Sequence, residues 1–272
     1  MEINREYAAG ILRKRDSEMH KGDAGHILIA AGSRGMTGAA VLSALGAFRT
    51  GAGLVYMYVP SEIFQILQIR VPEVICLDRK EKTDYGRYEA VIFGPGLRTG
   101  EEIRNLLSDI LANYNGSLLI DADGLNLIAK YDMYDEIEAS SASIVYTPHE
   151  GEASRHIGEN GSRTERAARL ASKLKGVTVL KGSRTIVTDG ERMMFNTSGN
   201  PGMAKAGSGD VLSGIAGALL GQGYDPFEAA ACAVYIHGLA GDMAAAERGQ
   251  WGIMATDIAD KASEAIKYII GE

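Results

Sequence analysis

The sequence is poor in cysteine, and this excludes several classes of protein. It contains only Cys76 and Cys232, which lie far apart in the chain and form no CxxC pair. Small secreted domains rely on several disulfides, and structural zinc sites are commonly built on closely spaced cysteines. Neither a disulfide framework nor a zinc site is therefore indicated.

Long apolar runs and an excess of positive charge are also missing. No apolar run approaches the ~18 residues of a membrane span, and the N-terminal stretch MEINREYAAGILRKRD is charged from its start, without the apolar core of a signal peptide. The net charge of −7 argues against a general nucleic-acid or anionic membrane surface. We expect a cytoplasmic protein with neither nucleic acid nor membrane as partner, although an anionic small ligand remains open.

Glycine, by contrast, is abundant. It accounts for 34 of the 272 residues, against a usual frequency of about 7%. The glycines cluster at the ends of apolar runs, which indicates tight turns at the rim of a sheet. The chain length suits two small domains or one large α/β domain. Because no linker, repeat or low-complexity tract is present, we expect a single domain over residues 1–272.

The apolar runs and glycine turns predict alternating strands and helices. The strand 26–31, the helix from Thr37 and the strand 54–59 form a βαβ unit, which implies parallel strands. The pair Asp189-Gly190 predicts a hairpin, and hence antiparallel pairing near one edge. Further expected strands are 74–77, 90–93, 117–120, 144–146, 177–180, 185–188 and 192–195, and further expected helices are 5–18, 101–111, 164–174, 225–247 and a last one starting at 256.

The first glycine turn does not fit a dinucleotide-binding motif. Gly32, Gly35 and Gly38 are spaced GxxGxxG rather than GxGxxG, and no acidic residue follows near the end of the second strand. The turn is either plain strand–helix packing or part of another ligand cleft. In open α/β sheets, ligands bind beyond the carboxyl ends of the strands. Four such ends carry glycines or polar groups: Gly32, residues 94–96, residues 121–126 and residues 147–152.

The stretch SGNPGMAKAGSGDVLSG, residues 198–214, is the most informative in the chain. Its glycines lead into a helix from about Ser208, and one face of that helix carries apolar residues from Val211 to Leu220. A bare helix N-terminus presents free N–H groups and the positive end of the dipole, which suit a phosphate. Asp210 in the first turn is placed to accept a proton. On local sequence alone, a simple chain reversal with a dipole-complementing acid is equally open.

Five segments together carry a family resemblance. They are HKGDAGHILIAAGS (20–33), VIFGPGL (91–97), LLIDADGLNLIA (118–129), TPHEGE (147–152) and NPGMAKAGSGDVLSGIAGALL (200–220). In this order they closely resemble the ADP- or ATP-dependent NAD(P)H-hydrate dehydratases, a carbohydrate-kinase-like family. The resemblance implies an α/β, ribokinase-like fold, with a central, mostly parallel sheet flanked by helices on both faces. It also implies repair of hydrated NADH and NADPH, with ADP as the favoured phosphoryl donor, Mg²⁺ as cofactor and a homotetramer as the assembly.

The resemblance assigns roles to individual residues. Asp210 matches the catalytic base, and Gly207, Ser208 and Gly209 match the amides that stabilise the transferring phosphoryl group. The nucleotide is implied to contact Lys181, Gly182, Ser183, Arg184, Thr185 and Gly209. The hydrated substrate is implied to contact Ala39, Gly96, His149, Asp210 and Asn126, and Asn200, like Asn126, either touches the ligand or supports a residue that does. Without the family, residues 181–185 are a strand end with a hairpin, and His149 is an ordinary loop or core histidine.

The sequence leaves open the metal ligands, the effect of two departures from the family pattern and two alternative functions. Asp121 and Asp123 are candidates to hold Mg²⁺ through water, or Asp121 simply caps a turn. The sequence has Gly124 where the family usually has alanine, and Lys205-Ala206 where a small residue and glycine are commoner. Lys205 either adds a cation beside the phosphates or points to solvent. The alternatives are a small-molecule kinase of the same fold, of the hydroxyethylthiazole or pyridoxal type, and a nucleotide-binding protein without catalysis.

Overall fold

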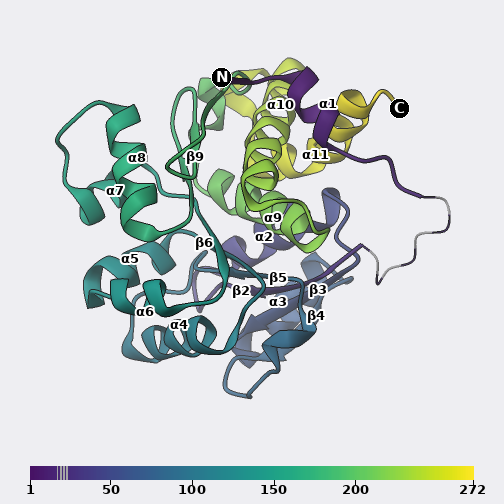
Figure 1. The fold of residues 1–272 in the computed structure, drawn as a ribbon. Coiled ribbons are helices and arrows are strands. Elements are labelled where there is room, and N and C mark those ends of the chain that lie inside the picture. Colours follow the sequence, from purple (N-terminus) through teal and green to yellow (C-terminus); the bar gives the residue numbers. More distant parts are fainter. Residues whose placement is uncertain (17, 19, 21, 23) are drawn as a thin grey trace.

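The computed structural model describes residues 1–272 except 17, 19, 21 and 23. Over this part of the chain, ten strands form one sheet in the order β1-β10-β9-β8-β7-β6-β5-β2-β3-β4 (Figure 1). The strands are β1 (Glu2–Ile3), β2 (His26–Ala30), β3 (Leu54–Val59), β4 (Ile75–Asp78), β5 (Ala90–Phe93), β6 (Ser117–Ile120), β7 (Ser143–Tyr146), β8 (Val177–Leu180), β9 (Ile186–Thr188) and β10 (Met193–Asn196).

The sheet is mostly parallel, as predicted. Strands β4, β3, β2, β5, β6, β7 and β8 pair in parallel in that spatial order. Only β9 runs against its neighbours, pairing antiparallel with both β8 and β10. The hairpin predicted at Asp189-Gly190 therefore joins β9 to β10, and β1 closes this edge by parallel pairing with β10.

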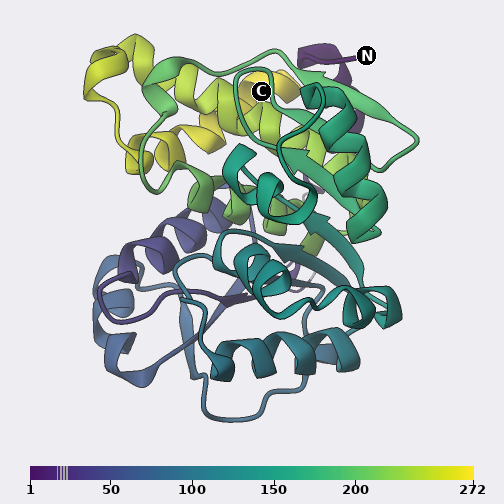
Figure 2. The ribbon, with the colours of Figure 1, turned by 90° about the vertical axis from the view of Figure 1, so that its left-hand side faces the viewer.

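Helices cover both faces of the sheet, which lies between the two helical layers in Figures 1 and 2. Alternate residues of β2 show the division: Ile27 and Ile29 pack in one core cluster, and Leu28 and Ala30 pack in the other. The first layer holds α1 (Arg5–Ile11), α2 (Thr37–Arg49), α3 (Phe64–Arg70), α9 (Ser208–Gly221), α10 (Pro226–Gly252) and α11 (Ala255–Ile270). The second holds α4 (Glu101–Asn113), α5 (Asp123–Tyr131), α6 (Tyr134–Ala139), α7 (Glu150–Ile157) and α8 (Arg163–Leu174).

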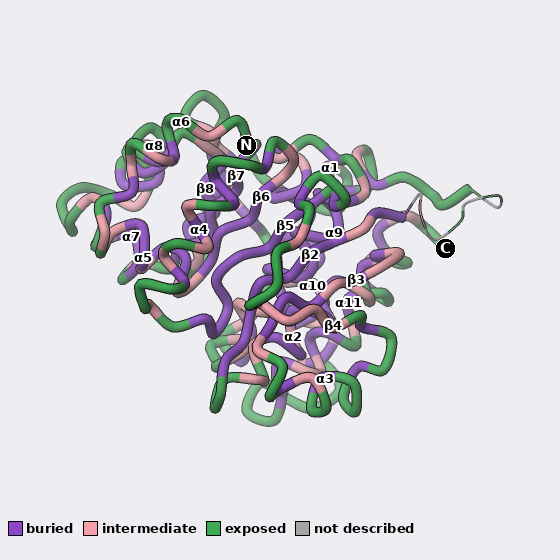
Figure 3. The backbone as a smooth tube through the Cα atoms, turned by 90° about the horizontal axis from the view of Figure 1, so that it is seen from below, coloured by how far each residue is buried: buried purple, intermediate pink, exposed green. Residues whose placement is uncertain are grey.

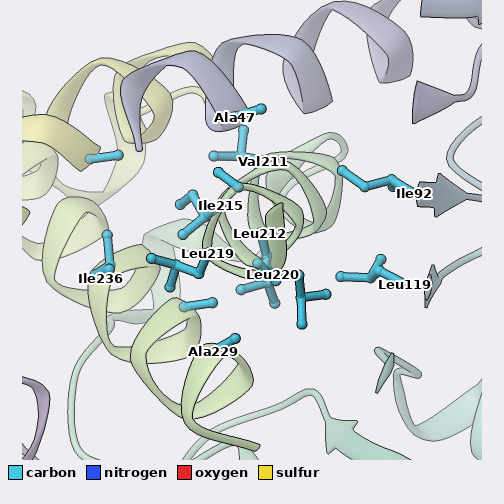
Figure 4. Packing of buried hydrophobic residues seen from close by; sticks show 14 of the residues in the cluster. Ala47, Ile92, Leu119, Val211, Leu212, Ile215, Leu219, Leu220, Ala229 and Ile236 are labelled. Carbon is cyan, nitrogen blue, oxygen red and sulfur yellow. The ribbon is translucent and has the colours of Figure 1, made fainter. Parts of the chain in front are cut away.

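Helix α9 is buried on nearly every side, whereas the sequence suggested a single apolar face. It packs on the sheet and is enclosed by α2 and α10, as Figure 4 shows. Small residues allow the close approach: a Cβ at Gly214 would overlap the carbonyl oxygen of Ser43, and one at Gly217 would overlap Ile92. The strand centres and α9 form the buried interior in Figure 3, so the helix that carries Asp210 is held rigidly.

Some predicted boundaries were wrong. The helix expected over 5–18 ends at Ile11, and residue 17 of that range lies outside the described residues, as do residues 21 and 23 of the segment 20–33. Helices α3, α5, α6 and α7 and strand β1 were not predicted.

Helix α10 has the length and hydropathy of a membrane span, but 67% of its most apolar window is buried inside the fold, as in a core helix.

Candidate active site

Five neighbouring parallel strands end at one edge of the sheet, and their following residues meet there. The segments after β2, β5, β6, β7 and β8 begin at Ala31, Gly94, Asp121, Thr147 and Lys181. Backbone bonds tie these segments to one another: Gly32 N–H donates to Pro95 O at 2.7 Å, and Lys181 N–H donates to Pro148 O at 2.8 Å. The segments predicted to form the site are thus adjacent in space.

The glycine loop enters α9 through a residue that must be glycine. Gly207 has a φ of 90°, in the left-handed region, and a Cβ there would overlap Leu42 Cδ1 on α2. No side chain caps the helix, and the first N–H groups of a helix have no acceptor within it. Ser208 N–H donates to Lys205 O at 3.3 Å. Of the three predicted phosphoryl-binding amides, that of Ser208 is therefore already used, whereas Gly209 offers a bare backbone.

A largely buried ion pair lies next to the glycine loop at the start of α9. Lys181 Nζ and Asp121 Oδ1 are 2.8 Å apart, and the Asp121 side chain is 2% exposed. Ser213 Oγ on α9 donates to Asp121 Oδ2 at 2.7 Å and to Gly209 O at 3.1 Å. A Cβ at Gly209 would lie 3.4 Å from Lys181 Nζ. A cation therefore lies next to Gly209 at the uncapped start of α9, where a phosphate would gain from the cation and from the helix N-terminus.

Asp210 projects from the first turn of α9 into this charged environment. Burial raises its pKa to about 7, assisted by the negative charges of Asp121 and Asp123 and opposed by Lys181. Burial lowers the pKa of Lys181, but the carboxylates of Asp121, Glu152 and Asp210 outweigh burial, so its pKa is raised overall. An acid whose pKa lies near neutrality is suited to accept a proton from a hydroxyl at physiological pH.

His149 has a structural role that the sequence did not reveal. It is the N-cap of α7: its Nδ1 accepts from Gly151 N–H at 3.0 Å and from Glu152 N–H at 3.2 Å. Glu152 returns a bond to the His149 N–H at 2.8 Å, which completes a capping box. The His149 side chain as a whole is 55% exposed, and its Nε2 lies 3.4 Å from Glu152 Oε1. Its contact with substrate stays a prediction.

The other predicted substrate contacts divide into two groups. Ala39, on the first turn of α2, and Gly96 lie together, since a Cβ on Gly96 would be 2.9 Å from the Ala39 Cβ. Asn126, in contrast, is engaged within the protein: its Oδ1 accepts from Arg155 at 2.9 Å and its Nδ2 lies 3.4 Å from Asp123. Its contact with substrate stays a prediction.

The side chains of the predicted nucleotide segment, residues 181–185, contact different parts of the protein. Lys181 pairs with Asp121 in the site. Arg184 pairs with Glu2 of β1 at 3.0 Å and is 62% exposed. Thr185 Oγ1 donates to Gly182 O at 3.0 Å, and Ser183 O accepts from Arg163 at 2.5 Å. Residues 182–185 thus form a turn at the surface, and their contact with a nucleotide stays a prediction.

The loop before α9 is anchored to α10 by side chains. Asn200 donates to Asp242 Oδ1 at 2.9 Å, and Gly199 N–H donates to Asp242 Oδ2 at 2.8 Å. Lys205 Nζ donates to the carbonyl oxygen of Trp251 at 2.9 Å, so this lysine does not point freely to solvent. Asn200 and Lys205 help to hold the loop in place.

Four residues of this site had no assigned role in the sequence reasoning: Glu152, Ser213, His237 and Asp242. His237 lies on α10 with its Nε2 2.9 Å from Ser208 O. The sequence gives only weak signs of their roles: Glu152 lies inside the motif TPHEGE, and His237 is a single basic residue in an otherwise apolar helical stretch.

The carboxylates do not form a metal site of their own. Among the described residues, no group of three histidine, cysteine or acidic side chains is arranged to hold a metal ion. Both oxygens of Asp121 are engaged, by Lys181 and Ser213, and Asp123 accepts from the Arg98 N–H at 2.7 Å. That Asp121 and Asp123 hold Mg²⁺ through water stays a prediction, because each carboxylate oxygen can accept a second hydrogen bond from a metal-bound water.

Comparisons with known proteins identify the family of this chain. The profile of the NAD(P)H-hydrate dehydratase family matches residues 27–264. The bifunctional NAD(P)H-hydrate repair enzyme of Thermofilum pendens is 38% identical over 95% of this chain and 53% of its own length. The chain spans about half the length of the curated relatives it matches.

Two solved structures share the fold. The ADP/ATP-dependent NAD(P)H-hydrate dehydratase of Bacillus subtilis, co-crystallised with ATP and Mg²⁺, is 28% identical, with a TM-score of 0.87 and 98% of both chains covered. A ribokinase-like superfamily protein of Enterococcus faecalis is 26% identical, with a TM-score of 0.89 over 99% of this chain and 96% of its own. This chain therefore belongs to the NAD(P)H-hydrate dehydratase family and has a ribokinase-like fold.

Proposed function

We propose that this protein returns the S-form of NADH and NADPH hydrates to NADH and NADPH by phosphorylation followed by loss of phosphate. The observation that carries the proposal is the position of Asp210: a carboxylate with a pKa of about 7, on the uncapped N-terminus of α9, beside the Lys181–Asp121 pair. This combination brings a proton acceptor, bare amides and a cation to one place, as phosphoryl transfer requires.

The reaction balances without an external oxidant. Asp210 accepts the proton of the C6 hydroxyl while that oxygen attacks the terminal phosphorus of ADP. The bond to the bridging oxygen breaks and AMP leaves, with Gly209 N–H and Lys181 nearest the developing charge. Loss of phosphate from C6 and of a proton from C5 then restores the ring double bond. Phosphate leaves more readily than hydroxide, which is why a kinase-type site can serve a dehydration.

The donor, the metal and the assembly are part of the proposal. We favour ADP over ATP as the phosphoryl donor, as the family resemblance implies. We propose that Mg²⁺ enters with the nucleotide, since the carboxylates beside Asp210 are engaged with other partners and the Bacillus subtilis relative was crystallised with ATP and Mg²⁺. We further propose a cytoplasmic homotetramer whose subunit is a single domain over residues 1–272. The one continuous sheet supports the single domain, and light scattering tests the tetramer.

A spectrophotometric assay tests the function. Hydrated NADH or NADPH is incubated with the protein, Mg²⁺ and either ADP or ATP, and absorbance at the reduced-nicotinamide band is followed. Recovery of absorbance with equimolar AMP formation from ADP is expected. Accumulation of a phosphorylated product without recovered absorbance would instead identify a small-molecule kinase. Nucleotide binding without turnover of either compound would identify a binding protein.

A further inference from the structure

His237, on helix α10, lies against Ser208, the first residue of helix α9. Its Nε2 lies 2.9 Å from Ser208 O and 3.2 Å from Ser208 Oγ. Burial lowers the pKa of His237 to about 4, opposed by the bond to the Ser208 backbone and assisted by Lys181, so the ring is neutral at pH 7. Because a carbonyl oxygen can only accept, the proton of the neutral ring resides on Nε2 and is donated to Ser208 O.

This bond acts on the peptide that precedes Gly209. The carbonyl of Ser208 and the N–H of Gly209 belong to one planar unit, and the described residues contain no cis peptide bond. In a trans peptide the C=O and the following N–H point in opposite directions. Holding Ser208 O from α10 therefore directs the Gly209 N–H away from α10 and out of the helix N-terminus. Gly209 itself lies next to Lys181, since a Cβ on it would be 3.4 Å from Lys181 Nζ.

We propose that His237 is a positioning residue for phosphoryl transfer, which orients the Ser208–Gly209 peptide so that the Gly209 N–H meets the transferring phosphoryl group. The inference rests on the proposed function of the same site. It adds a residue outside the glycine loop, which donates from behind the peptide and does not touch the ligand. Such support matters because an amide that stabilises developing charge must be fixed before the reaction begins.

A second buried histidine supplies the matched control. His156, on α7, also has its pKa lowered to about 4, mainly by burial. Its Nδ1 lies 3.0 Å from the hydroxyl of Tyr134, so it links α7 to α6 rather than to the glycine loop. Replacing it removes a buried imidazole of the same kind without acting on α9.

The first experiment compares His237→Leu, His237→Gln and His156→Leu for kcat, KM, affinity for AMP and melting temperature. We expect His237→Leu to lower kcat by about 10- to 100-fold, somewhat less than outright loss of an oxyanion donor, with KM and AMP affinity little changed. His237→Gln keeps an N–H donor near the Nε2 position and is expected to recover most of that loss. His156→Leu is expected to affect the melting temperature only.

Two results would overturn the inference in that experiment. One is an equal fall of kcat in His237→Leu and His156→Leu, which would assign His237 a merely structural role. The other is a glutamine variant no more active than the leucine variant, which would show that the donated bond is irrelevant.

A measurement without turnover separates this inference from the proposed function. AMP and inorganic phosphate are added to the ¹⁵N-labelled protein, and the Gly209 amide resonance is followed. A phosphate-dependent shift in the wild type and in His156→Leu, lost in His237→Leu, supports the role of His237 even if hydrated NADH is not a substrate. An equal shift in His237→Leu, or no shift in the wild type, contradicts it.

Discussion

Replacing Asp210 by asparagine is expected to stabilise the protein above pH 7 while removing its activity. The reason is the environment of the carboxylate. Burial and the neighbouring charge of Asp121 raise the pKa of Asp210 from 3.8 to about 7. The ionised carboxylate that catalysis needs is therefore less stable in the folded protein than in water, and it lowers the free energy of unfolding. Asparagine has nearly the same shape and carries no charge.

The size and sign of the effect follow from that rise. One pKa unit corresponds to about 1.4 kcal/mol, so the ionised carboxylate costs the fold up to roughly 4 kcal/mol. Below about pH 4 the carboxyl group is protonated in both the folded and the unfolded chain, and the full stability is present. Between pH 4 and pH 7 only the unfolded chain ionises, so the free energy of unfolding of the wild type falls as the pH rises. Above pH 7 the loss is complete.

Urea unfolding of the wild type and Asp210→Asn between pH 4.5 and pH 8.5 measures this difference. The stability advantage of the variant is expected to grow with pH up to about 7.5 and then to level off, with no hydrate turnover at any pH. Asp260→Asn is the control, because Asp260 forms an exposed pair with Arg49. An advantage that did not change with pH, or a variant less stable than the wild type at pH 8, would refute the argument.

Two further perturbations test the surroundings of Asp210. The kcat/KM of the wild type is expected to rise with pH around an apparent pKa of about 7, as Asp210 ionises. Lys181→Met should move this rise to higher pH, since Lys181 lowers the pKa of Asp210. A pH profile unchanged in Lys181→Met would show that Lys181 does not influence the catalytic base. The same variant leaves the buried Asp121 unpaired and should cost about 3–5 kcal/mol of stability. Gly207→Ala imposes a left-handed conformation and a clash with Leu42, which should cost about 2–4 kcal/mol in thermal unfolding. The added variant Leu42→Ala should relieve the steric part, and a strictly additive double variant would contradict the clash.

The strand ends could be predicted because their signals are local. Short apolar runs next to glycine or polar residues predicted β3, β5, β6 and β8 with their observed bounds. The helix that carries Asp210 was predicted from its glycine loop and apolar spacing. The burial of α9 on nearly every side was not predicted, because it depends on close packing by helices α2 and α10. This packing uses glycines that look like ordinary turn or spacer residues in the sequence.

The bonds of the site depend on contacts between distant parts of the chain. Lys181 and Asp121 are separated by 60 residues, and His237 meets Ser208 across 29 residues. Neither spacing follows a helix or strand period, so no pattern in the sequence could indicate it. His149 illustrates a local limit as well: an N-cap histidine is uncommon among capping residues, and α7 was missed for this reason. The roles of the predicted site residues in binding and catalysis stay predictions.

The glycine at position 124, where the family usually has alanine, is explained by its neighbours. A Cβ there would lie 2.7 Å from Ile120 Cγ2 and 3.0 Å from Phe93 Cδ1, and both side chains are fully buried. Alanine gains about 1 kcal/mol over glycine in a helix, but overpacking a rigid core costs about 1–3 kcal/mol. Ile120 Cγ2 is held on a strand and cannot swing away, so overpacking is expected to prevail.

Gly124→Ala alone should therefore lower the free energy of unfolding by about 1 kcal/mol, the difference between the helix gain and the middle of the overpacking range. Phe93→Leu added to it should recover part of the loss, because the smaller side chain frees space beside the new methyl group. Urea unfolding of the single and double variants at pH 7 measures both effects. A Gly124→Ala protein as stable as the wild type would show that the core accommodates the methyl group, and the departure from the family pattern would then have no packing cause.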